Sequence, residues 1–306
     1  MSQNEKHLKG ERISEATLLV ITIIWGSSFM VTHFAFAAGL SPLFILMCRF
    51  SIAAVFMGIF YFKRIIKALR VAHIKYGILL GSIFFLAFYT SLVGLKYSSP
   101  SNNAIITCTN VVIVPLIWWL KTRIRPRSSV FFSCAISLVG LLVISLDFSQ
   151  GFTLHMGDIF SFLSAILFAA QIVSIGEMSQ HIDHCELVFM EFLTAAFLSV
   201  AFYLLTERGA YYFTDLSSVL SILYLGIVCT CICFLLQAWA MRSVNSTRGA
   251  VIMSTEALFG SIISILAGSD VLSWRIIIGG LLITSAVILP ELKPKQSSGA
   301  VSRING

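Results

Sequence analysis

Charged residues are scarce in this chain, and that scarcity narrows its class before any motif is considered. Asp, Glu, Lys and Arg together make up 11% of the 306 residues, whereas soluble domains carry ~25%. Hydrophobic residues make up 58%. A soluble fold of this composition would leave a large apolar surface in water. The composition therefore excludes an ordinary soluble domain and indicates an integral membrane protein.

The sequence also lacks the short motifs that common enzymes and pumps carry. It contains no Gly-x-Ser-x-Gly elbow, no His-Glu-x-x-His and no Walker phosphate loop. Its seven cysteines imply no disulfide framework. In Cys229-Thr230-Cys231-Ile232-Cys233, successive cysteines stand at i and i+2 and point about 200° apart on a helix, which favours packing over metal binding. We therefore expect no enzyme activity, no metal and no cofactor. Without a phosphate loop, we expect an ion gradient or the substrate's own gradient to drive transport.

Long apolar segments are what the chain has in abundance. They recur about ten times at roughly 20 residues, the length at which a helix crosses ~30 Å of hydrocarbon. We place them at 16–36, 42–62, 75–95, 100–120, 129–146, 157–177, 187–206, 217–240, 247–268 and 273–290. The predicted fold class is an all-α membrane protein with ten transmembrane helices.

Basic residues gather on one side of these predicted spans. If the N-terminus is cytoplasmic, 17 of the 21 Lys and Arg residues lie in or at the edge of the cytoplasmic segments and three on the outer side, with Arg49 left inside a span. Short loops rich in Lys and Arg stay in the cytoplasm. This asymmetry predicts a multi-pass protein of the cell (cytoplasmic) membrane with both termini in the cytoplasm. The net charge of +7 follows from the same bias, so we expect the lipid bilayer and no nucleic acid as a partner.

The two halves of the chain are related by an internal repeat. Residues 95–106 align with residues 241–252 without a gap. The same alignment, continued, places Asn110 opposite Glu256. In a multi-pass membrane protein, internal duplication is typical of transporters.

Four short motifs lie in order along this duplicated frame, namely Trp25-Gly26-Ser27-Ser28-Phe29, Arg49-Phe50, Gly157-Asp158 and Thr255-Glu256. Their order and spacing resemble the EamA family of the drug/metabolite transporter superfamily, from about residue 16 to residue 289. The resemblance implies two inverted five-helix repeats around a central cavity, here residues 1–150 and 151–306 packed as one membrane domain. It also implies transport of amino acids or related small metabolites.

The chain departs from the family pattern after the fourth span and around the ninth. Residues 121–127, which are rich in Lys and Arg, stand where a Glu is common, and Ser269-Asp270 replace the usual Gly-Glu. Ala257 stands where Pro commonly follows the ninth-span Glu. Because alanine continues a helix that proline would bend, the usual reason for a kink at residue 257 is missing.

Arg49 is a charge within the second predicted span. Placing it near the bilayer centre costs ~2.5–3.5 kcal/mol on insertion scales, so it should face the bundle or a water-filled cavity. Two roles are open. Arg49 either binds a carboxylate or phosphate of the substrate, or locks its helix to neighbouring carbonyls.

Glu256 lies near the middle of the ninth predicted span, and by this placement it is the only acidic residue so deep in a span. Burial would favour its neutral form. It is a candidate for proton coupling or for binding a substrate amine. The alternative is a protonated carboxyl that bonds to a neighbouring helix.

Further polar and aromatic side chains are candidates for the cavity wall. The fourth span carries a polar stripe on one helical face, made of Ser99, Asn103, Thr107 and Asn110. Gln171 and Gln237 lie deep in the sixth and eighth spans, and Trp25 and Tyr89 offer ring faces to a substrate. Hydrogen bonding between helices is the alternative for the polar residues, and packing is the alternative for the rings.

These features together predict a secondary transporter that moves a small molecule by alternating access around a central cavity. We expect an amino acid or related compound, with export favoured and with proton coupling as one role for Glu256. The alternatives are export of cationic drugs or purine-like compounds, and a non-transporting membrane sensor. The sequence leaves substrate, direction, coupling ion and oligomeric state open.

Overall fold

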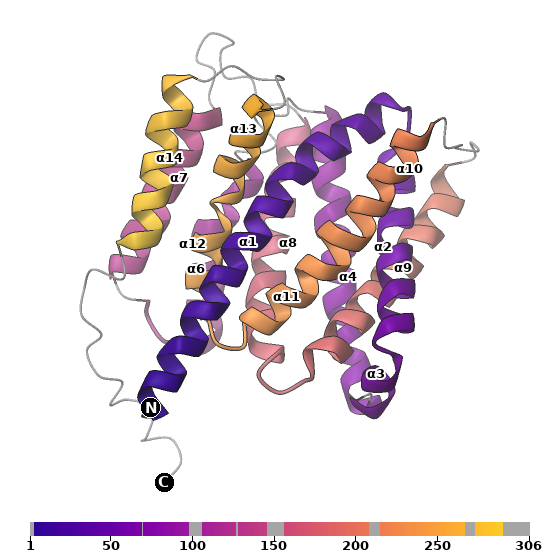
Figure 1. The fold of residues 1–306 in the computed structure, drawn as a ribbon, viewed down its shortest axis with the longest axis horizontal. Coiled ribbons are helices and arrows are strands. Elements are labelled where there is room, and N and C mark those ends of the chain that lie inside the picture. Colours follow the sequence, from indigo (N-terminus) through magenta and orange to yellow (C-terminus); the bar gives the residue numbers. More distant parts are fainter. Residues whose placement is uncertain are drawn as a thin grey trace.

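The computed structural model describes residues 3–68, 70–97, 106–126, 128–145, 156–207, 215–266 and 273–289, and all regular structure in them is helical (Figure 1). The helices of the first half are α1(Gln3–Ala37), α2(Pro42–Phe60), α3(Phe62–Ala68), α4(Val71–Tyr97), α6(Asn110–Thr122) and α7(Ser128–Ser145). Those of the second half are α8(Met156–Met178), α9(His184–Thr206), α10(Leu216–Leu223), the π-helix η1(Tyr224–Ile232), α11(Cys233–Ala240), α12(Ser246–Met253), α13(Glu256–Leu266) and α14(Trp274–Ile288).

Each of the ten predicted apolar segments overlaps a helix of the structure. Six helical stretches are long and apolar enough to cross a bilayer, namely Gly10–Ala37, Pro42–Phe60, His73–Gly94, Met156–Met178, His184–Thr206 and Leu216–Ala240. Ile106–Thr122, Ser128–Val143 and Trp274–Ile288 are shorter apolar helices. The chain is therefore a multi-pass, all-helical membrane protein, while the count of ten spans stays a prediction.

Several helices begin where the sequence offers a polar cap. The Ser41 hydroxyl accepts from the Phe44 amide over 3.0 Å, directly before Pro42 at the start of α2. The carboxylate of Asp183 caps α9 in the same way, over 2.9 Å to the Cys185 amide. Such side chains satisfy backbone donors that the first helical turn leaves without partners. The segment boundaries therefore follow from local chemistry as well as from hydrophobicity.

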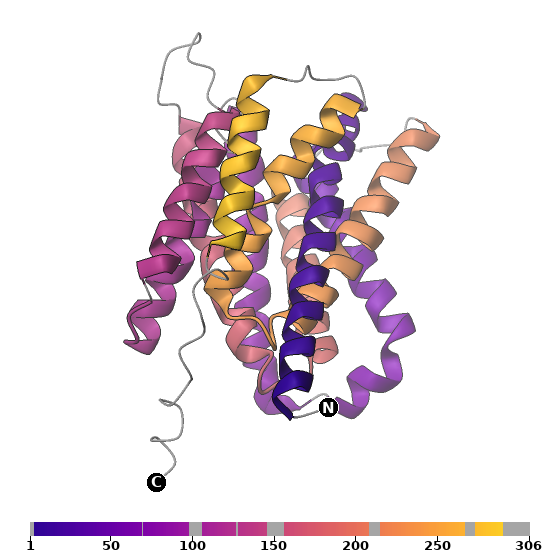
Figure 2. The same cartoon turned by 60° about the vertical axis from the view of Figure 1, so that its left-hand side comes forward.

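The helices of the two halves pack on each other in pairs that repeat when the halves are exchanged. In the repeat, α1 corresponds to α8, α4 to the segment that ends in α11, and α6 to α12 and α13. The contact of α4 with α8 therefore corresponds to that of α1 with α11, and the contact of α6 with α8 corresponds to that of α1 with α12 and α13. α2 packs on α9, and α7 on α14, which makes each of these a pair of corresponding helices (Figures 1 and 2). This pattern agrees with duplication of one unit. The start of α1 and the end of α14 lie at the same end of the bundle.

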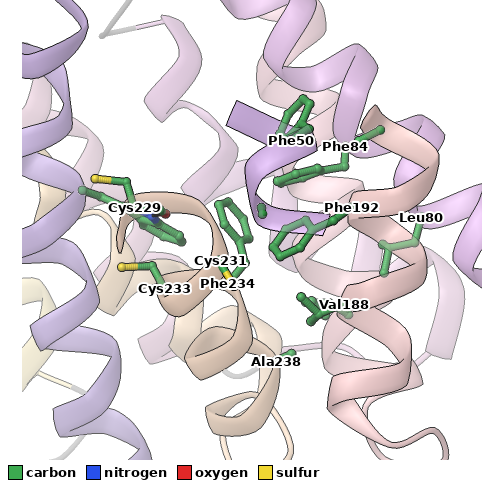
Figure 3. Close-up of a cluster of buried hydrophobic side chains, with 14 of the residues drawn as sticks. Phe50, Leu80, Phe84, Val188, Phe192, Cys229, Cys231, Cys233, Phe234 and Ala238 are labelled. Atoms are coloured by element: carbon green, nitrogen blue, oxygen red, sulfur yellow. Dashed lines mark hydrogen bonds between the residues drawn. The ribbon is translucent and has the colours of Figure 1, made fainter. Parts of the chain in front are cut away.

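An aromatic cluster fills the centre of the bundle between the two halves (Figure 3). The Phe84 ring of α4 lies 5.1 Å from that of Phe50 in α2, 4.6 Å from Phe234 in α11 and 6.2 Å from Phe192 in α9. Such tilted and edge-on ring contacts are favourable beyond their buried area. Lipid tails are as apolar as these rings, so close packing, and not exclusion from water, holds this cluster together.

Candidate functional site

Two helices break at corresponding points of the internal repeat. α12 ends at Met253, and a turn at Ser254 and Thr255 separates it from α13, which begins at Glu256. In the first half, a turn at Thr109 precedes α6. The Thr109 amide bonds to the Ile106 carbonyl over 3.2 Å, and the Thr255 amide to the Ile252 carbonyl over 3.1 Å. The repeat alignment pairs these residues one for one.

The threonine hydroxyls reinforce both breaks. Thr109 Oγ1 donates to the Ile106 carbonyl over 2.6 Å, and Thr255 Oγ1 donates to the Ile252 carbonyl over 2.7 Å. Hydroxyl groups that bond to the preceding turn compete with the helical ladder and bend helices. The ninth segment is thus interrupted at Thr255, two residues before Ala257, although no proline is present. Nothing in the sequence predicts this interruption. Asn110 and Glu256 each become the first residue of a new helix, an arrangement that many transporters use at their substrate sites.

Arg49 of α2 reaches the π-helix of the second half. Its side chain is buried, and its Nε donates to Thr230 Oγ1. Thr230 in turn donates to the Leu225 carbonyl over 2.7 Å, five residues earlier, as the wider helix allows. The guanidinium carbon lies 4.7 Å from the centre of the Phe88 ring, which supports it as a cation–π partner. The sequence singles out neither Thr230 nor Phe88. The π-helix that carries Thr230 has no sequence signature, and Phe88 is one of 25 phenylalanines in the chain.

Glu256 faces the same interior as Arg49. The two side chains interact electrostatically. Glu256 also interacts with Cys108 of the fourth segment and with Cys229 and Cys233 of the eighth. The carboxylate forms neither a hydrogen bond nor an ion pair with any residue that the structure describes. Opposite charges from the two halves therefore face one interior without closing on each other.

Trp25 and Gln237 border this region. Trp25 Nε1 donates to the Cys229 carbonyl over 2.9 Å, and its ring lies 4.9 Å from that of Phe234. Gln237 is 1% exposed, with Nε2 3.4 Å from Met253 Sδ, and its Oε1 is buried without a partner among the described residues. An orphaned buried acceptor in a native structure needs an explanation, such as water or a ligand.

The polar stripe of the fourth segment is only partly described. Thr107 Oγ1 is buried and has no partner within the described part of the chain. It lies next to Cys108, which interacts with Glu256. Asn110 is half-buried at the start of α6. Asn103, like Ser99, lies outside the described residues.

Two predicted cavity residues lie elsewhere. The Tyr89 ring stacks on Phe85 at 5.9 Å and contacts Phe202 of α9 at 5.9 Å, so Phe88 and not Tyr89 is the ring beside Arg49. Gln171 donates to Glu191 Oε1 over 3.0 Å. Glu191 is fully buried in α9, seven residues after its start at His184, so Glu256 is not the only acidic residue inside the bundle.

Comparison with known sequences decides the family. The model of the EamA-like transporter family matches residues 12–146 and again residues 155–290. The chain belongs to this family. The double match also agrees with the internal repeat.

Known relatives of this EamA-like transporter agree in class. Two proteins of Archaeoglobus fulgidus, each described as an uncharacterized transporter, are similar to it. One is 29% identical over 277 residues, covering 90% of this chain and 85% of the relative. The other is 25% identical over 284 residues, covering 91% and 98%. A solved structure described as "Crystal structure of protein" has a TM-score of 0.79 at 16% identity, covers 93% of this chain and 97% of its own, and shows the same fold.

Four salt bridges join the two halves of this EamA-like transporter. They are all the salt bridges among the described residues, and each pairs a residue of the first half with one of the second. They are Arg64–Asp183 at 3.0 Å, His73–Glu186 at 3.0 Å, Lys121–Glu177, and Arg248–Glu15 at 2.9 Å. The helix α3, which carries Arg64, lies at the end of the bundle where α1 begins (Figure 1).

The Arg64–Asp183 pair changes the titration of both groups. Burial alone would raise the pKa of Asp183, but the hydrogen bonds from Arg64 and from the Cys185 amide lower it below its ordinary value. The pKa of Arg64 is raised, chiefly by the hydrogen bond to Asp183. Both groups therefore stay charged at neutral pH.

A cavity of about 310 Å³ opens at the same end, between α6, α8 and the turn that joins α11 to α12. Its wall includes Lys121, Glu177, Gln180 and Arg242. Gln180, two residues after the end of α8, donates from Nε2 to the Arg242 carbonyl over 2.7 Å and so links the end of α8 to this turn. The wall does not include Arg49 or Glu256.

Proposed function

We propose that this chain is a secondary transporter for a small metabolite that carries both a carboxylate and an amine, an amino acid or a related compound, with export favoured. The observation that carries the proposal is the pair of opposite charges at Arg49 and Glu256. They come from different halves of the molecule and interact without direct contact.

Arg49 is suited to the carboxylate. Only its Nε is engaged by a described residue, Thr230. Its two terminal nitrogens have no hydrogen-bond partner among the described residues and are free to take one from a substrate. A guanidinium offers parallel donors that match the two oxygens of a carboxylate. The Phe88 ring behind it restricts its orientation.

Glu256 is suited to the amine. The residue is half-buried, and no described residue bonds to its carboxylate. A second candidate substrate is a cationic compound without a carboxylate. The Trp25 and Phe234 rings favour it, because ring faces attract cations. Trp25 also bonds to the carbonyl of Cys229, a residue that interacts with Glu256.

We place the end of the bundle where α1 begins on the cytoplasmic side. The excess of Lys and Arg in the loops at that end supports this orientation. Alternating access would then break the contacts at Arg64, His73, Lys121 and Arg248 when the site opens to the cytoplasm. Both termini are cytoplasmic in this arrangement.

Counterflow in proteoliposomes tests the proposed substrate class. The panel contains an amino acid, its amide, which lacks the carboxylate, and its N-acetyl derivative, which lacks the amine. We expect exchange of the amino acid and at least tenfold weaker exchange of both derivatives. Exchange of the amide at an equal rate would favour the cationic substrate, and no exchange across a broad panel of amino acids would reject the proposal.

A further inference from the structure

Glu191 is a second carboxyl group inside the bundle, and the proposed substrate site does not use it. Its side chain is 0% exposed, about 10 Å along α9 from the first residue of that helix. Gln171 Nε2 of α8 donates to Glu191 Oε1 over 3.0 Å. The other oxygen, Oε2, is buried and has no hydrogen-bond partner among the described residues.

No charge in the described structure compensates a charge on Glu191. α9 packs on α2, α3, α4 and α11, and no charged or titratable side chain of these helices bonds to Glu191 in the described structure. Arg49 bonds to Thr230, Arg64 to Asp183 and His73 to Glu186, Tyr89 stacks on Phe85, and Cys233 interacts with Arg49 and Glu256. On α8, Glu177 pairs with Lys121. Glu191 has no electrostatic partner among them.

If Glu191 were ionised, a full negative charge would be buried away from water, with the Gln171 amide as its only hydrogen-bond donor among the described residues. The effective cost of such a burial is several kcal/mol, whereas a neutral acid costs far less. A proton on Oε2 removes the charge and leaves the bond from Gln171 to Oε1 intact. The local chemistry therefore favours the acid form in the packed state.

The position of Glu191 links that proton to the contact between the halves. A Cβ at Gly81 of α4 would lie 2.6 Å from the Glu191 carbonyl oxygen and 2.6 Å from Thr194 Cβ. The backbone of α4, from the first half, therefore lies directly against α9, from the second half, at this residue. If the halves separate here, water reaches the carboxyl group and can accept its proton.

We propose that Glu191 is a proton-binding site at the contact between the two halves of the molecule. The carboxylate takes one proton from water to become the acid, and returns it to water in the reverse step, with no other bond made or broken. This site deepens the proposed function, since a role in coupling requires transport. The protonation of Glu191 itself does not require it.

Infrared spectroscopy of the purified protein in lipid at neutral pH tests the site without any transport assay. The measurement is made in a Glu256→Gln background, which removes the carboxyl group of the proposed substrate site. Glu191→Gln should abolish the carboxylic acid C=O absorption of one residue. Glu177→Gln, which changes a half-exposed carboxylate paired with Lys121, should leave that absorption unchanged.

Gln171→Leu provides a second test that does not depend on the folding of Glu191→Gln. It should keep the acid absorption but shift it to higher wavenumber, because the C=O group loses its hydrogen bond. Absence of the acid absorption from the parent protein, or its persistence in Glu191→Gln, would overturn the proposal. An absorption that disappears on addition of sodium ions would assign the site to a metal cation instead. Failure of the amino acid counterflow with a positive infrared result would reject the transport proposal alone.

Discussion

One nitrogen of the Arg49 side chain, Nε, is hydrogen-bonded, whereas its two terminal nitrogens have no hydrogen-bond partner among the described residues. Nε is held by Thr230, and the Phe88 ring lies behind the guanidinium. The two roles that the sequence leaves open, substrate binding and a structural link between helices, are therefore compatible in one side chain. Variants that keep the charge but change its shape separate the two roles.

Arg49→Lys should weaken substrate exchange while the protein still folds. A lysine keeps the positive charge but loses the paired donors, and hydrogen bonds to charged groups contribute ~1.5–3 kcal/mol each. We expect the substrate concentration for half-maximal exchange to rise about tenfold or more. Arg64→Lys, at the exposed end, is the matched control and should have little effect on exchange. Normal exchange by Arg49→Lys would leave Arg49 with the structural role alone.

Asp183→Asn should remove an acid-dependent part of the stability. The folded pKa of Asp183 is lowered, so its charge stabilises the fold above the unfolded pKa of ~3.9, and this contribution is lost as pH falls through the folded pKa. Both partners are partly exposed, so we expect a loss of at most ~1 kcal/mol at neutral pH. Asparagine keeps the helix cap. Thermal unfolding should show the wild type and the variant converging in acid, and a constant difference at all pH values would contradict this account.

At the scale of helices, the close contact of α1 with α13 sets the position of Glu256. A Cβ at Gly26 would lie 2.7 Å from the Gly260 amide nitrogen and 3.1 Å from the Glu256 carbonyl oxygen. These atoms belong to the backbone, so no side-chain rotation can relieve the overlap. Any larger residue at position 26 must push the two helices apart.

Gly26→Ala should therefore lower thermal stability and disturb exchange together. Overpacking of this kind costs ~1–3 kcal/mol. Gly58→Ala in α2 is the control, because its Cβ would meet only Phe189 Cε2 at 3.6 Å, an ordinary contact. The control should be neutral or slightly stabilising, since alanine favours the helix. Equal melting temperatures for the two variants would argue against the close α1–α13 contact.

The sequence predicts the helices better than it predicts their interruptions. Apolar length is dictated by the bilayer, so each segment is visible as a run of residues. The breaks at Thr109 and Thr255 depend on hydroxyl bonds to the preceding turn, which any threonine in a helix can make or omit. The π-helix that carries Thr230 depends on packing and is equally hidden. The sequence could nominate Arg49 and Glu256 singly, but only the fold brings their charges into one interior.

The division into two five-helix halves remains a proposal about the whole molecule. The swapped helix contacts and the double family match support it. The inverted orientation of the halves requires ten spans, of which six are long and apolar enough by themselves. The shorter apolar helices and the broken ninth segment are the parts that need an experimental topology.

Reporter fusions after Arg70, Arg127 and Leu292 should all report a cytoplasmic position. The prediction follows from the 17 of the 21 Lys and Arg residues that lie in or at the edge of the predicted cytoplasmic segments. Fusions after Lys96 and Arg208 are the controls and should report the opposite side. An external reading at Arg127 would contradict the ten-span arrangement.

The central claim is that Arg49 and Glu256 together recognise a zwitterionic substrate, and Glu256→Gln tests it most directly. The variant keeps the side-chain shape and removes its charge. We measure binding, counterflow and accumulation driven by a pH gradient for wild type, Glu256→Gln and the control Glu207→Gln in the same proteoliposomes. Glu207 accepts a hydrogen bond from Ser41 and takes part in neither the proposed substrate site nor the salt bridges between the halves. The account predicts that binding and counterflow of the amino acid fall together by about tenfold or more in Glu256→Gln only. Loss of pH-driven accumulation with intact binding and counterflow would assign Glu256 to proton coupling instead, and unchanged values in all three measurements would contradict the claim.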